Sequence, residues 1–122
     1  MFGIELRDNE ITILKLRNDG YSYRECAKKL GFKHYQQAVH LYKTTLKKMR
    51  EWSDLTSHYP EFVITAHNFG KTQRWLLVFY KFMKKNNLLY QWKRMSDEEL
   101  KAIPGFGRDY LWFIRALRQS AK

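Results

Sequence analysis

Two helix-start signals of the same kind, one in each half of the chain, most constrain what it can fold into. Glu25 follows Ser22 by three residues, and Glu99 follows Ser96 at the same distance. In such a capping box the serine side chain accepts a hydrogen bond from a backbone N–H of the first helical turn, and the glutamate accepts one from the backbone N–H of the serine. Glycine supplies the stops, because it adopts the left-handed conformation that ends many helices. These stops lie at Gly20, Gly31 and Gly70.

Apolar side chains recur at helical spacing between these signals, and the alternation and hairpin turns of β-strands are missing from the sequence. The expected helices span residues 8–19, with Asp8 as N-cap, 23–30, 34–52, 61–68, 71–86, 97–103 and 108–119. The helix over 71–86 would bury a stripe of Trp75, Val78, Phe79, Phe82 and Met83. The predicted fold class is therefore all-α, in two small units over residues 1–52 and 61–122. A polar linker is expected over 53–60, where Pro60 disfavours helix at Tyr59.

The charge balance indicates a polyanionic partner. The 122 residues include 23 Lys and Arg against 12 Asp and Glu, which gives a formal net charge of +11. Two stretches, 33–50 and 71–94, contain several cations each and no acid. Such a surplus usually serves nucleic acid or an acidic membrane surface, the alternative being a basic face that is merely solvated. No apolar run approaches the roughly 20 residues of a membrane span, and the charged start is unlike a secretory signal. We expect a cytoplasmic, nucleoid-associated protein with no membrane partner.

The sequence offers little for chemistry. Cys26 is the single cysteine, which excludes an internal disulfide framework and a Cys-rich zinc site. The four histidines lack partners at metal-ligand spacing. The sequence contains neither a Gly-rich phosphate loop after a strand nor a Ser/His/Asp set suited to nucleophilic catalysis. We therefore expect no metal, no cofactor and no enzymatic activity.

The first half has the pattern of a helix-turn-helix. A short helix that turns the small Ala27 inward is followed by Gly31, which permits a sharp turn, and then by a longer helix with a polar outer face. In DNA-binding proteins of this kind the last helix enters the major groove, where Gln can pair with adenine and Lys can reach guanine or phosphate. The candidate contacts are Lys33, Tyr35, Gln36, Gln37, His40, Lys43, Thr44 and Lys47. The inward face would carry Ala38, Leu41 or Tyr42, Thr45, Leu46 and Met49. The alternative is a plain three-helix bundle with a basic face.

Residues 6–50 also resemble region 4 of bacterial sigma factors and the related helix-turn-helix of response regulators. The likeness is carried by ILKLRNDGYSYRECAKKLGF over residues 13–32 and by LKKMR over residues 46–50. In that family the third helix reads promoter DNA, so the resemblance implies this role for Tyr35, Gln36, Gln37, His40 and Lys43. The chain departs from the family in a turn one residue longer and in Lys33, which stands where a capping Ser or Thr is usual.

Residues 100–111 have the form of a helix-hairpin-helix. Gly105 and Gly107 would let the backbone turn tightly, with Ile103 and Phe106 filling the hairpin from inside. The N–H groups of the turn and of the next helix would then point outward together and suit a DNA phosphate without reading sequence. The candidate contacts are Gly105, Gly107 and Arg108. The alternative is a purely structural hairpin or a protein-docking surface.

This half resembles the C-terminal domain of the bacterial RNA polymerase alpha subunit. The likeness is carried by MSDEEL over residues 95–100, IPGFG over 103–107 and Leu111, and more weakly by ITAHN over 64–68. That family binds the minor groove of upstream promoter DNA and contacts transcription activators, so the resemblance implies double-stranded DNA or a transcription factor as partner. The chain departs from the family near Ile64, where a DNA-contacting Arg is expected, and at Asp109, where the second residue of a basic pair is expected.

These features together predict a sequence-specific DNA-binding transcription regulator of bacterial or phage type. The first unit would read the major groove, and the second would contact the DNA backbone or the transcription machinery. Two alternatives stay open: a protein-interaction module that binds RNA polymerase or a regulator, and a nonspecific nucleic-acid-binding protein. No heptad seam indicates a dimer, and the oligomeric state stays open.

Overall fold

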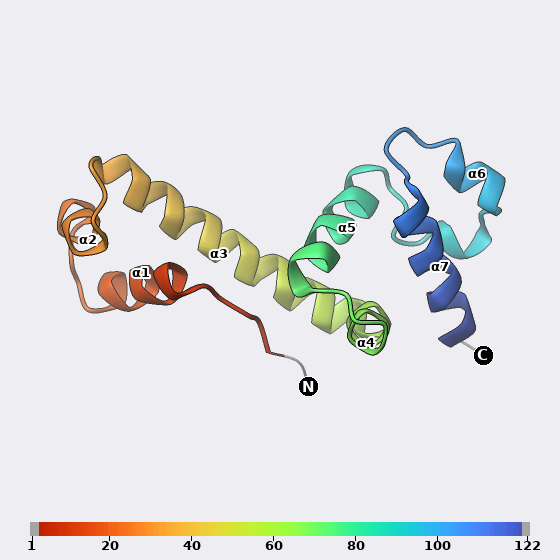
Figure 1. Ribbon diagram of the computed structural model, residues 1–122, viewed down its shortest axis with the longest axis horizontal. Coiled ribbons are helices and arrows are strands. Elements are labelled where there is room, and N and C mark those ends of the chain that lie inside the picture. Colours follow the sequence, from red (N-terminus) through yellow and green to blue (C-terminus); the bar gives the residue numbers. More distant parts are fainter. Residues whose placement is uncertain (1–2, 121–122) are drawn as a thin grey trace. The chain divides into compact units, whose positions relative to one another are not determined.

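The computed structural model describes residues 3–120, and over them it is all-helical, which confirms the predicted fold class (Figure 1). The elements are α1 (Asp8–Asn18), α2 (Tyr23–Leu30), α3 (Tyr35–His58), α4 (Pro60–Asn68), α5 (Gln73–Lys85), the 3₁₀ helix η1 (Trp92–Arg94), α6 (Asp97–Lys101) and α7 (Arg108–Ser120). No strand occurs among the described residues. The chain divides into two compact units, the first ending at Ser53 and the second beginning at Asp54.

Local hydrogen bonds explain where the helices of the first unit begin and end. The Ser22 hydroxyl oxygen accepts from the Glu25 backbone N–H at 3.2 Å, and Gly31 ends α2 with φ of 77°. The Glu25 carboxylate accepts from the Ser22 hydroxyl itself at 3.0 Å. At α1 the expected N-cap, Asp8, is wrong: Arg7 takes that position, and its backbone N–H donates to Glu10 Oε1 at 2.8 Å.

Small side chains form the core of the first unit. Ile13 of α1, Cys26 and Ala27 of α2 and Ala38 of α3 are buried together. Larger side chains pack around them with part of their surface exposed: Leu16, Tyr21, Tyr23, Leu30, Phe32, Leu41 and Tyr42. Because Cys26 and Ala27 are small, the backbones of α1 and α2 approach closely. Of the inward face predicted for α3, Ala38 and Thr45 are buried, whereas Met49 is 37% exposed and was wrongly assigned to it.

A buried ion pair ties α1 to α3. Lys48 Nζ lies 3.2 Å from Glu10 Oε1, and the Glu10 side chain is only 4% exposed. Burial alone would raise the pKa of this carboxyl. The hydrogen bonds from the Arg7 backbone N–H and from Lys48, together with the positive charges of both residues, outweigh burial and hold the pKa below its ordinary value. The Glu10 carboxylate is therefore negatively charged, and its charge helps to hold α1 to α3.

The expected end of the third helix at Trp52 is wrong, because α3 continues to His58. Residues 53–58, predicted to lie in a polar linker, are helical instead. Trp52, Leu55 and Tyr59 are buried at helical spacing, which outweighs the polar residues between them. Tyr59 itself is not helical, with φ of −135° and ψ of 55°, as expected before a proline. Pro60 occupies the first turn of α4, where its missing N–H leaves no bond unmade.

An aromatic core holds the second unit together. Phe62 of α4, Phe79 of α5 and Phe113 of α7 are completely buried, and the centroid of Phe79 lies 4.9 Å from that of Phe113. Trp75 stacks on Phe79 with a centroid distance of 5.5 Å. The stripe predicted for α5 is correct for Phe79 and Met83, which are buried, but wrong for Val78, which is 53% exposed.

Candidate nucleic-acid interface

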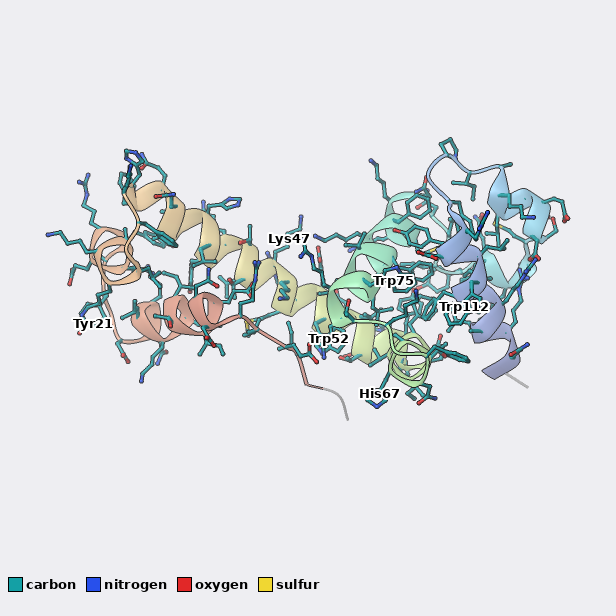
Figure 2. All side chains as sticks on the ribbon, viewed as in Figure 1. Tyr21, Lys47, Trp52, His67, Trp75 and Trp112 are labelled. Atoms are coloured by element: carbon teal, nitrogen blue, oxygen red, sulfur yellow. The ribbon has the colours of Figure 1, made fainter. Side chains whose placement is uncertain are left out.

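A narrow face of α3 carries four of the candidate DNA contacts. Gln36, His40, Lys43 and Lys47 follow one another at spacings of four, three and four residues, so they project from one side of the helix. All four side chains are exposed, and Lys47 is labelled on α3 in Figure 2. The opposite side of the helix carries the buried residues Ala38 and Thr45. We call these four residues the α3 outer face.

The other four candidates of the first unit flank this face, and the structure exposes them as well. They are Lys33, Tyr35, Gln37 and Thr44. The Thr44 hydroxyl donates to the α3 backbone, to the carbonyl oxygens of His40 at 2.9 Å and Leu41 at 3.1 Å. The single hydroxyl proton is therefore used within the helix, and the Thr44 hydroxyl oxygen can accept a hydrogen bond from a ligand.

Gln37 has a structural role that the sequence interpretation missed. Its side-chain Oε1 accepts from the backbone N–H of His34 at 3.1 Å, and its own backbone N–H donates to the His34 carbonyl at 3.2 Å. These bonds fix the first turn of α3. The available signal was a glutamine three residues after a helix start, which is the position of the acid in a capping box.

The basic surface also extends onto α2, which the sequence interpretation missed. The Arg24 guanidinium lies 4.8 Å from the centroid of the Tyr35 ring. A shallow pocket where α2 meets the start of α3 contains no acid among its lining residues, Arg24, Ala27, Lys28, Phe32, Lys33, His34, Tyr35 and Gln36. Arg24 and Lys28 lie four residues apart on α2, and this spacing is the signal that could have found them.

Other cations of the first unit stabilise the fold. The Arg17 guanidinium lies 4.1 Å from the centroid of the Tyr23 ring, and its Nη1 donates to the Tyr21 carbonyl at 2.8 Å. Lys48 is paired with Glu10. These side chains hold α1, α2 and α3 together, so the positive charge offered to a ligand comes from the remaining Lys and Arg.

Of the two glycines in the hairpin between α6 and α7, only Gly105 has a backbone conformation that favours glycine. Gly105 has φ of 85°, and a Cβ placed on it would lie 3.0 Å from the Phe82 ring. Gly107 has no positive φ, and a Cβ there would meet open space. The expectation that both glycines make the tight turn is therefore wrong for Gly107. Phe106 is buried, and its N–H donates to the Ile103 carbonyl at 3.0 Å.

Exposed acids occur close in sequence to the three candidate contacts of the hairpin. Gly105, Gly107 and Arg108 are exposed, but so are Asp109 beside Arg108 and the two glutamates of the α6 first turn, Glu98 and Glu99. Arg108 and Asp109 line the same shallow pocket next to Gly105. Asp109 therefore offsets part of the positive charge of Arg108, which makes the hairpin a weaker phosphate site than its backbone suggests.

Asp97 is held in a structural ion pair rather than offered to a ligand. Arg115 Nη2 lies 2.8 Å from its Oδ2, and Arg118 Nη1 lies 2.7 Å from its Oδ1. The hydrogen bonds from Arg115 and Arg118 hold the pKa of this carboxyl below its ordinary value. The two arginines thereby attach the start of α6 to α7.

Within the described part of the chain, no group of three or more His, Cys, Asp or Glu side chains is placed to hold a metal ion. No helix of residues 3–120 is long and apolar enough to cross a membrane. Comparisons with protein-family models, with curated proteins and with solved structures find no match to this chain. The likeness to the sigma and alpha families rests on the residues quoted above alone.

Proposed function

We propose that this protein is a sequence-specific DNA-binding transcription regulator, in which the α3 outer face enters the major groove of duplex DNA. The observation that carries the proposal is the chemistry of that face. It presents an amide, an imidazole and two ammonium groups on one side of a helix whose opposite side is buried. A helix of this kind fits the major groove, which admits one α-helix and displays donors and acceptors on the base edges.

The side chains would divide between base reading and phosphate binding. Gln36 lies in the first turn of α3, where its amide can pair in two places with adenine. Lys43 and Lys47 lie farther along the helix and suit phosphates of the groove walls. Arg24 and Lys28 of α2, beside the start of α3, would neutralise further phosphates. Gln37 would act by fixing the helix start.

Selection of bound duplexes from a random pool tests this proposal. We expect one sequence motif to be enriched. Gln36→Ala should relax preference at one position of the motif by about 1–3 kcal/mol, because one bidentate contact is lost. Lys47→Ala should weaken binding to all sequences alike. No enriched motif, or a Gln36→Ala variant with unchanged preference, would refute the role given to α3.

A second candidate function, docking on the transcription machinery, is favoured by an exposed aromatic pair in the second unit. Phe69 and Trp112 are 45% and 43% exposed, and their rings meet edge to face with centroids 5.1 Å apart. Aromatic side chains are enriched in protein interfaces. Binding of purified RNA polymerase that survives nuclease treatment, and that Trp112→Ala abolishes, would support this function. Binding that nuclease removes would contradict it.

A further inference from the structure

The exposed side of α5 forms a second basic surface, in the second unit. Arg74, Val78, Lys81 and Lys85 follow one another at spacings of four, three and four residues, so they share one side of the helix. All four side chains are exposed. We call them the α5 outer face. No acid occurs anywhere between residues 71 and 94, and the cations Arg74 and Lys85 lie exposed at the two ends of this face.

Helix stability explains the position of Lys85 but not that of Arg74. Cations in the last turn, such as Lys84 and Lys85, interact favourably with the negative end of the helix dipole. Arg74 lies in the first turn, because Thr72 is the N-cap and accepts a hydrogen bond from the Trp75 N–H at 3.1 Å. A cation in the first turn opposes the dipole. The position of Arg74 therefore does not stabilise α5, and we attribute it to the binding of an anionic ligand.

The rest of α5 argues against a membrane surface as the partner. An amphipathic helix binds lipid by burying its apolar side among the acyl chains. In α5 that side is buried in the protein: Leu76, Leu77, Phe79, Tyr80 and Met83 belong to the core of the second unit. The α5 outer face offers only Val78 for insertion. A charged surface with one small apolar residue suits the phosphates of a nucleic acid instead.

The dimensions of this face also fit a DNA strand. At about 1.5 Å of rise per residue, the eleven steps from Arg74 to Lys85 cover about 16 Å. Phosphates of one strand advance by about 3.4 Å each along the duplex axis. The face is therefore long enough for the cations at its two ends to reach different phosphates of the duplex. It carries no amide that could pair with a base, so it would bind DNA without reading sequence.

We propose that the second unit contacts the phosphate backbone of duplex DNA through the α5 outer face rather than through the hairpin between α6 and α7. The proposal rests on the proposed function, because it supposes that the protein binds DNA. It differs from the sequence interpretation, which assigned this contact to Gly105, Gly107 and Arg108. Asp109, which lines the same pocket as Arg108, makes the hairpin the poorer of the two surfaces.

The salt dependence of DNA binding tests the proposal on the full chain. The α5 variant Arg74→Gln/Lys85→Gln and the hairpin variant Lys101→Gln/Arg108→Gln each remove two exposed cations, so their net charges match. Affinity for a mixed-sequence duplex is measured by fluorescence anisotropy over a series of salt concentrations, after circular dichroism shows unchanged helix content. The α5 variant should lower the slope of log affinity against log salt by about 1.8, or about 0.9 per phosphate contact. The hairpin variant should leave the slope unchanged.

The other outcomes each overturn a distinct statement. A slope that falls equally in both variants would show an effect of net charge alone and would overturn the α5 contact. A fall in the hairpin variant alone would return the contact to the hairpin. If Lys43→Gln/Lys47→Gln lowers the slope and the α5 variant does not, the proposed function stands and the α5 contact fails. Binding to vesicles containing phosphatidylserine, without binding to the duplex, would overturn both proposals.

Discussion

Replacing Gly105 and Gly107 by serine, one at a time, tests which of the two glycines the hairpin turn requires. Gly105→Ser adds a Cβ to a residue with φ of 85°, a conformation that costs an L-residue about 1–2 kcal/mol. The new Cβ would also lie 3.0 Å from the Phe82 ring, so the ring must shift. Gly107 has no positive φ and open space around a Cβ. Its carbonyl accepts the Leu111 N–H at 3.2 Å, which makes it the N-cap of α7, where serine is a preferred residue.

The expected result is a clear separation of the two variants. Thermal unfolding is followed by tryptophan fluorescence, since Trp75, Trp92 and Trp112 all belong to the second unit. Each kcal/mol shifts the melting temperature of a unit of this size by about 4–8 °C, so Gly105→Ser should lower it by about 4–16 °C. Gly107→Ser should leave it unchanged or raise it slightly. Equal destabilisation by both variants would refute the assignment of the turn to Gly105 alone.

Three further predictions follow from hydrogen bonds and ion pairs. Because folding lowers the pKa of Glu10 below 4.5, the stability it adds is present above that pH and is lost as the pH falls through the lower folded value. Acid should therefore reduce the melting temperature of the first unit less steeply in Glu10→Gln than in the wild type, and equal steepness would contradict this. Gln37→Ala removes the acceptor of the His34 N–H and should lower both helix content and DNA affinity, whereas Gln37→Glu keeps an acceptor and should retain helix content; lower DNA affinity in Gln37→Ala with unchanged helix content would assign Gln37 to base reading instead. Asp97→Asn should lower the melting temperature of the second unit more than Glu98→Gln, because only Asp97 joins α6 to α7, and a calorimetric scan of the two variants compares them.

Local signals in the sequence predicted the helices well, because caps and stops act within a few residues. Ser22 and Ser96 cap their helices and Gly31 is left-handed, as predicted, but only Ser96 and Glu99 form the complete capping box. Helix ends that depend on burial were harder to predict. The residues after Trp52 look polar, yet Leu55 and Tyr59 are buried, and α3 runs on to His58. Which of these side chains become buried depends on contacts in three dimensions, and helical spacing alone does not predict those contacts.

The same limit applies to the candidate sites. Helical spacing placed Val78 in an apolar stripe, but it lies between Arg74 and Lys81 on the exposed side of α5. The exposed side of α3 was predicted residue by residue, because charged and amide side chains leave few alternatives for which side faces water. The sequence could not show whether Gln37 fixes the helix start or contacts a base, because a glutamine side chain suits both.

The α3 and α5 outer faces share one spacing and differ in what they carry. On α3 the first position is an amide, followed by an imidazole and two ammonium groups; on α5 an arginine and two lysines surround a valine. A surface without base recognition holds a protein equally well at every point of a genome, and so permits sliding during target search. Substitutions on the α5 outer face would then change how far the protein slides along DNA before it dissociates. Substitutions on the α3 outer face would change the sequence that it recognises.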